Sequence, residues 1–136
     1  MYNPWRHAFQ LGLAIEFVPN LRPRATYCAG LVQIRRGLSQ RERRTALAHE
    51  IVHYQRGDEA GMECTRWHLE KRERLVHLVA ARRLLTIEDL ADALHDPDPA
   101  AAAWVDDYTW ALRMANLDPL ETAELEHRFG DDWRVA

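Results

Sequence analysis

Two histidines one helical turn apart constrain this chain more than any other feature. His49 and His53 enclose Glu50 in the pattern His-Glu-x-x-His, inside the run 45–54, which predicts a helix. Residues four apart lie on one helix face, so both imidazoles can ligate a single metal ion. Glu50 lies about 100° around the helix from His49, where it can reach a water on the metal but is poorly placed to ligate. The spacing therefore predicts two zinc ligands and one general base.

The alternative is a surface helix that carries two titratable histidines. The residues between and before the motif positions are apolar, which indicates that this helix is at least partly buried. Buried imidazoles and carboxylates need partners, and a metal ion is a good one. The apolar residues are Ala46, Leu47, Ala48, Ile51 and Val52.

Catalytic zinc usually has a third protein ligand and an open position. A metzincin-type third histidine is excluded, because the glycine stands at 57 and position 59 is glutamate. A second long helix is predicted over 66–85, and on it Glu73 and His77 share one face with Ala80 and Ala81. Small residues there allow two helices to approach closely around a metal, so we prefer Glu73 as the third ligand. The other candidates on this helix are Glu70, His68 and His77.

Pattern and capping signals predict the remaining elements of an α+β fold, mostly helical, with a small two- to three-stranded sheet. Asn3 and Pro4 begin a first helix, and Ser39 with Glu42 forms a capping box that opens the zinc helix. A loop is expected at 58–64. The other expected elements are a helix to about 11, strands at 13–18, 26–28 and 31–35 (the last two separate or one bent strand), the zinc helix to Gly57, and helices at 87–95, 100–116 (interrupted near Asp106-Asp107) and 119–130.

Length and charge predict one domain, 1–136, with two unlike halves. Residues 1–85, the expected catalytic core, hold 15 Lys and Arg against 8 Asp and Glu, whereas residues 86–136, an acidic helical extension, hold 3 against 13. We find neither a secretory signal nor an apolar run as long as a membrane span, and therefore expect a cytoplasmic protein. In that compartment Cys28 and Cys64 are expected to be reduced thiols.

Several separate motifs resemble those of the ImmA/IrrE family of metallo-endopeptidases, over about residues 3–95. The resemblance implies a small sheet packed on the zinc helix, a zincin-like fold of the minimal gluzincin type, with zinc held by His49, His53 and Glu73 and with Glu50 as the base. It also implies substrates that are helix-turn-helix repressors or similar regulators of a phage, mobile element or stress response. That family often has a small polar or acidic residue at the position of His77, which we interpret as a support for the ligands or a rival ligand. The matching motifs are Glu42-Arg43-Arg44, Leu47 to His53, Arg56-Gly57, Glu73-Arg74-x-Val76 and Ala80 to Leu85.

Some other side chains have a functional and a purely structural interpretation. Tyr27 and Tyr54 could stabilise an oxyanion, although tyrosines beside a buried motif more often belong to the core. Arg43 and Arg44 begin the zinc helix, where we slightly favour solvated charge over pairing with acidic residues of the C-terminal half. Packing is the expected role of the tryptophans Trp5, Trp67, Trp104 and Trp110.

The segment 86–116 has a weak helix-turn-helix pattern, but a DNA reader should carry a basic recognition surface, and this segment is acidic. Direct nucleic-acid binding is therefore not expected, and the segment is interpreted as a docking or core-completing appendix.

The leading hypothesis is a zinc endopeptidase that cuts a protein substrate, such as a transcriptional repressor. The alternatives are a regulatory module that grips a partner on the same fold without cutting it, and a SprT-like protease of DNA-bound proteins, which would use a histidine as third ligand.

Overall fold

The strands at the N-terminal end of the chain form one mixed sheet with β3 in its centre. The structure is a computed structural model and describes residues 1–58 and 65–135. β1 (Ala14–Val18) runs parallel to β3 (Leu31–Arg35), and β2 (Ala25–Cys28) pairs antiparallel with the other side of β3. β2 and β3 are separate strands of a hairpin, which settles the choice left open by the sequence. Gly30 makes the turn with a φ of +81°, a backbone conformation open to glycine without strain.

The inner face of the sheet carries its apolar residues. Val32 and Ile34 of β3 are fully buried, and Ala25 and Tyr27 of β2 are nearly so. β1 lies at the edge and is less covered than its alternating pattern suggested, with Phe17 remaining 38% exposed. The sheet therefore buries mainly the face made by β2 and β3.

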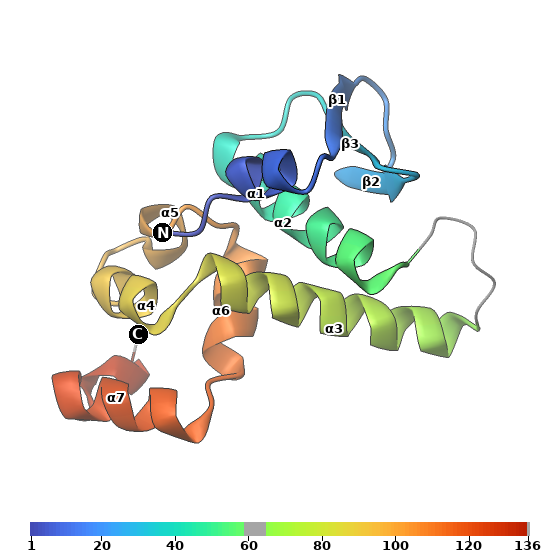
Figure 1. Ribbon diagram of the computed structural model, residues 1–136. Coiled ribbons are helices and arrows are strands. Elements are labelled where there is room, and N and C mark those ends of the chain that lie inside the picture. Colours follow the sequence, from blue (N-terminus) through green and yellow to red (C-terminus); the bar gives the residue numbers. More distant parts are fainter. Residues whose placement is uncertain (59–64, 136) are drawn as a thin grey trace.

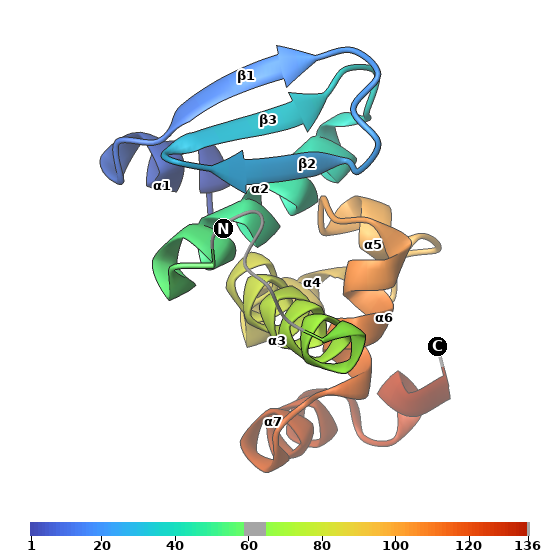
Figure 2. The same cartoon turned by 90° about the vertical axis from the view of Figure 1, so that its right-hand side faces the viewer.

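α2 (Gln40–Arg56) is the central helix of the fold, and α1 (Pro4–Gln10) packs beside it. The Ser39 hydroxyl accepts from the Glu42 N–H at 3.2 Å, and the Glu42 carboxylate accepts from the Ser39 N–H at 3.1 Å, so the predicted capping box is present. The sheet and α1 lie on one side of α2, and the helices that follow α2 in the chain lie on its opposite side (Figures 1 and 2). Because both sides are covered, the middle of α2 is buried from Arg44 to Ala48 and from Glu50 to His53.

Each side of α2 contributes to a different hydrophobic cluster. Leu47 and Ile51 belong to the cluster beneath the sheet, whereas Ala48 and Val52 belong to the cluster formed with the later helices. His49 and His53 directly follow Ala48 and Val52 and lie on the helix surface beside that row, so the packing of the core fixes the direction in which they project.

α3 (Arg66–Leu84) packs against α2 through a row of apolar residues on one of its faces. This row consists of Val76, Ala80 and Leu84, which are buried in the helical cluster, whereas Leu75, outside the row, is 44% exposed. The alanine contact brings α3 close to α2, as expected. The predicted loop at 58–64 lies outside the described residues except for Asp58, and so does Cys64, whereas Cys28 is exposed on β2.

The C-terminal half consists of short helices. The interruption expected near Asp106-Asp107 is present and divides the segment 100–116 into two helices. Asp106 caps the second helix by accepting from the Thr109 N–H at 2.8 Å, and Trp104, two residues before this cap, has a φ of +59°. The helix expected at 87–95 ends at Ala93. These elements are α4 (Ile87–Ala93), α5 (Pro99–Ala102), α6 (Asp107–Ala115), α7 (Pro119–Phe129) and the 3-10 helix η1 (Asp132–Val135).

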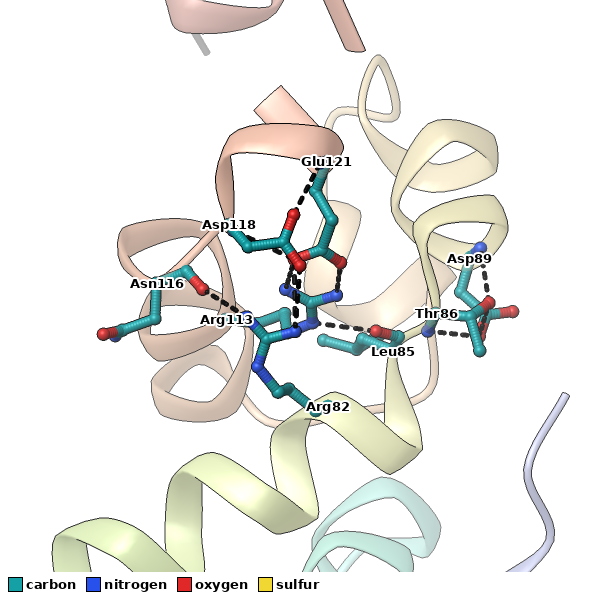
Figure 3. Close-up of polar contacts among 8 residues, drawn as sticks. All are labelled: Arg82, Leu85, Thr86, Asp89, Arg113, Asn116, Asp118 and Glu121. Carbon is teal, nitrogen blue, oxygen red and sulfur yellow. Dashed lines mark hydrogen bonds and ion pairs between the residues drawn. The ribbon is translucent and has the colours of Figure 1, made fainter. Parts of the chain in front are cut away.

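Two buried arginines tie this half to the rest of the chain. Arg113 of α6, 2% exposed, donates to the Leu85 carbonyl at 2.9 Å and pairs with the Glu121 carboxylate, so it joins the end of α3 to α7 (Figure 3). Arg44 of α2 donates to the carbonyls of Trp104 at 2.8 Å and of Tyr2 at 2.9 Å. The interpretation of Arg44 as solvated charge was therefore wrong.

The tryptophans do not share one role. Trp67 and Trp104 are 62% and 50% exposed, so packing was the wrong interpretation for both, whereas Trp110 packs against the helical cluster. Trp5 stacks on Phe17 at a ring distance of 6.2 Å. None of the helices in the described part of the chain combines the length and apolar composition that a bilayer crossing requires.

Candidate metal centre

Three side chains from two helices converge on one point beside α2. Nε2 of His49 and Nε2 of His53 are 3.1 Å apart. The Glu73 carboxylate reaches over from α3, with Oε2 at 2.9 Å from His49 Nε2 and Oε1 at 3.0 Å from His53 Nε2. All candidate ligand atoms lie within 4.8 Å of one another. The group is therefore close enough to hold one metal ion.

The chemistry of this donor set fits zinc. Bonds of about 2.0–2.1 Å in a tetrahedral site place the donor atoms about 3.4 Å apart, only slightly wider than the separations observed here. Two imidazoles and one carboxylate also leave a fourth position for a water or a substrate atom. Such a set is typical of catalytic zinc rather than of a closed structural site.

Asp58 prepares His53 for ligation. Its Oδ2 lies 3.1 Å from Nδ1 of His53, and a carboxylate at that nitrogen favours the proton on Nδ1, which leaves Nε2 free to ligate once a metal ion is bound. The sequence analysis missed Asp58. The available signal was its place directly after Gly57, whose left-handed backbone ends α2 and turns the chain back, so that the Asp58 N–H donates to the His53 carbonyl at 3.0 Å.

The charges of the group reinforce one another. Hydrogen bonds from His49 and His53 hold the pKa of Glu73 far below its usual range, so its carboxylate stays ionised. Burial opposes the charged form of His53, but Glu73 and Asp58 outweigh it and raise its pKa. An anionic carboxylate beside two imidazoles is the electrostatic arrangement that attracts a divalent cation.

Glu50 lies beside the group without joining it. Its side chain is buried, with 7% of the residue exposed, and its carboxylate is not one of the converging ligands. Burial raises the pKa of Glu50 above its usual value, the two motif histidines oppose that shift, and Glu73 adds to it. A carboxyl group with a raised pKa is suited to accept and return a proton near neutral pH.

The rival third ligands stay outside the group. Burial and, after it, the charge of His49 lower the pKa of His77 to about 4. The His77 ring lies against the His49 ring at a tilt, with 4.2 Å between the ring centres. His68 and Glu70 lie on the exposed first turns of α3, where His68 contacts Thr65 at 2.6 Å and Glu70 pairs with Arg66 at 3.2 Å. Among the described residues, Glu73 alone completes the cluster with the motif histidines.

One buried atom of the site lacks a partner. Nδ1 of His49 makes no hydrogen bond to any of the residues that the structure describes. A buried ring nitrogen without a partner lowers the stability of the folded state, and a strong interaction of the other ring nitrogen can offset that loss. Nε2 of His49, which faces the cluster, is the atom that can make it.

The tyrosines proposed as oxyanion donors have structural roles. Tyr27 is 8% exposed, its hydroxyl accepts from the Gly30 N–H at 3.3 Å, and its ring meets that of Tyr54 edge to face at 5.6 Å. Tyr27 also lines the cleft beside the metal cluster, but Tyr54 does not. Ring packing gives both residues a structural role, to which Tyr27 adds its hydrogen bond, and the oxyanion interpretation stays a prediction.

The cluster lies in a cleft of about 500 Å³ that three parts of the chain enclose. α2 provides the floor, β2 and the residues before it provide one wall, and α3 with the start of α6 provides the other. The C-terminal half, expected to lie outside the catalytic core, also contributes residues to the lining of this cleft. The residues from that half are Asp106, Tyr108 and Thr109.

Comparison with known proteins gives no relative: no family model, no curated protein and no solved structure matches this chain.

Proposed function

We propose that the chain is a zinc-dependent endopeptidase with His49, His53 and Glu73 as metal ligands and Glu50 as general base. The observation that carries this proposal is the convergence of the two Nε2 atoms and the Glu73 carboxylate in an open cleft, with the buried Glu50 beside them. A sheet packed on the helix that bears the motif also agrees with the zincin-like fold that the ImmA/IrrE resemblance implies.

Zinc, when bound, polarises the scissile carbonyl and makes the attacking water more acidic. Glu50 accepts the proton of that water as its oxygen adds to the carbonyl carbon, and then returns the proton to the nitrogen of the leaving amine. Asp58 holds the His53 ring in the required tautomer throughout. The buried surroundings of Glu50 keep its proton exchange within the cleft.

The substrate proposed is an exposed, extended segment of a protein. β2 is an edge strand whose residues Ala25 to Tyr27 line the cleft, and an extended peptide can pair with such an edge beside the metal. That this protein is a helix-turn-helix repressor or a similar regulator rests on the family resemblance. The SprT-like alternative is less favoured, because the residue that lies with the two histidines is a glutamate.

The test separates metal binding from cleavage. In zinc-loaded protein, Glu50→Gln should retain one zinc ion but lose at least about 100-fold in the rate of casein or peptide-mixture hydrolysis, since the amide cannot accept the proton. His53→Ala should lose both zinc and cleavage. Full activity of the Glu50→Gln protein would exclude this mechanism. A zinc-bound wild type that cuts no peptide would instead support the non-cleaving binding module.

A further inference from the structure

Tyr108 is placed in a way that its own packing does not explain. It is 55% exposed, whereas the next residue, Thr109, is 4% exposed. Its ring makes an edge contact with His77 at 5.3 Å, and no described residue hydrogen-bonds to its hydroxyl. An aromatic ring held largely in solvent contributes little to folding, so its position invites another explanation.

That position is the wall of the metal cleft. The ring of His77 lies between Tyr108 and His49, 5.3 Å from the first and 4.2 Å from the second. Tyr108 is therefore one ring removed from a proposed metal ligand. An extended chain advances about 3.3–3.6 Å per residue, so a substrate held at the proposed metal position has several side chains near the cut bond within reach of this ring.

Several residues that line the cleft together with Tyr108 are small or apolar. β2 supplies Ala25 and Tyr27, and α2 supplies Ala46. The charged pair here is already neutralised, because Nη1 of Arg24 lies 2.5 Å from Oδ2 of Asp106. An uncharged side chain is thus favoured over a charged one.

The Arg24–Asp106 pair and Tyr108 also separate this space from a neighbouring one. All three residues line both the metal cleft and an adjoining cavity of about 360 Å³, so they form the partition between them. The metal cleft therefore has a defined end, into which a side chain can fit.

We propose that Tyr108 is a specificity-determining residue whose ring forms one wall of a subsite for a bulky apolar or aromatic side chain adjacent to the scissile bond. The inference rests on the proposed metal site and names the substrate class that the site selects. The subsite joins β2 to α6, more than 80 residues further along the chain.

A matched pair of small ligands tests the subsite without requiring turnover. Acetohydroxamic acid and 3-phenylpropanohydroxamic acid present the same metal-binding group, and only the second carries a phenyl ring. In zinc-loaded full-length protein, calorimetry should show the phenyl compound binding about tenfold more tightly, as burial of roughly half a ring provides. Tyr108→Ala should reduce that ratio to about twofold or less and leave the acetohydroxamate Kd unchanged. Tyr108→Phe should keep the ratio.

The control is Trp67→Ala, which removes an exposed aromatic residue of α3 that does not line the cleft, and it should leave the ratio unchanged. An unchanged ratio in Tyr108→Ala, or no preference in the wild type, overturns the subsite. Failure of either hydroxamate to bind the zinc-saturated wild type overturns it as well. Failure of the endopeptidase proposal is seen separately, as intact peptides in the presence of zinc-loaded wild-type protein.

Discussion

At the scale of single residues, Asp58 orients the His53 ring although its own carboxylate is not one of the three converging groups. Asp58 accepts from Nδ1 of His53 and is also 3.0 Å from Nε of Arg56. A carboxylate in this role fixes the ring and makes its other nitrogen more basic. In the proposed zinc site the negative charge of this carboxylate, and not merely an oxygen in its place, should therefore contribute to zinc affinity.

Replacing Asp58 with asparagine should weaken zinc binding by about tenfold or more, because the amide cannot supply the negative charge. Competition with a chromophoric chelator measures this directly. Asp107→Asn is the matched control, since that carboxylate is 85% exposed and does not line the metal cleft. Equal zinc affinity in the Asp58→Asn and wild-type proteins would show that the contact does not tune the site.

At the scale of elements, α2 is fastened to the C-terminal half by Arg44. This side chain is nearly buried and donates to backbone carbonyls of Tyr2 and Trp104. Arg44→Met should lower the free energy of unfolding by about 2–3 kcal/mol, because it leaves those carbonyls without their donor. Arg43→Met, one position earlier, removes a partly exposed guanidinium that lies 6.0 Å from the centre of the Phe17 ring, and should cost less than about 1 kcal/mol. Urea unfolding of both variants gives the comparison, and equal stabilities would contradict it.

α7 is held by a second arginine, and this contact predicts a pH dependence. A hydrogen bond from Arg113 lowers the pKa of Glu121 to about 2, from an ordinary value of 4.5. A depressed folded-state pKa stabilises the fold fully above the unfolded value, and that stabilisation is lost as the pH falls toward the folded value. The contribution of Glu121 should therefore be complete near pH 6 and mostly gone near pH 2.

The corresponding variant is Glu121→Gln. It should lower the free energy of unfolding by about 2 kcal/mol at pH 6 and by clearly less at pH 3, where the wild type has already lost part of the same stabilisation. Glu124→Gln, on the same helix, removes an exposed pair with Arg128 and should cost less than about 0.5 kcal/mol. A Glu121→Gln deficit that does not shrink between pH 6 and pH 3 would refute the account.

At the scale of the whole molecule, metal binding and folding should be linked. The ligands come from α2 and α3, and these helices pack through the same buried cluster, so an ion that bridges them stabilises the folded state alone. Zinc at 100 times its Kd should add about 2.7 kcal/mol, measured as a rise of several degrees in Tm that a chelator reverses. Glu50→Gln should keep that rise and His53→Ala should lose it. A Tm indifferent to zinc in the wild type would argue against a site between the helices.

Local signals predicted most of the elements and the metal cluster. The capping box at Ser39 and the His49–His53 spacing act over a few residues, so they can be read without knowing the fold. The preference for Glu73 needed only one further inference, that small residues let two helices approach.

Contacts between distant parts of the chain could not be predicted in the same way. Arg44 and Arg113 look like surface charges until the carbonyls that they meet, tens of residues away, are known. Tyr108 likewise carried no local signal, because its place in the cleft depends on where α6 lies relative to β2. Tertiary packing, and not propensity, determines these three roles.

The wall that holds Tyr108 and the helix that holds the motif histidines belong to stretches of chain far apart in the sequence. In the proposed endopeptidase, selectivity and chemistry could therefore diverge separately over evolutionary time: changes around residues 106–109 would alter the proposed subsite while the proposed metal ligands and general base stayed intact. The same separation makes that short stretch the natural place to begin if the protein is to be re-engineered toward a chosen cut.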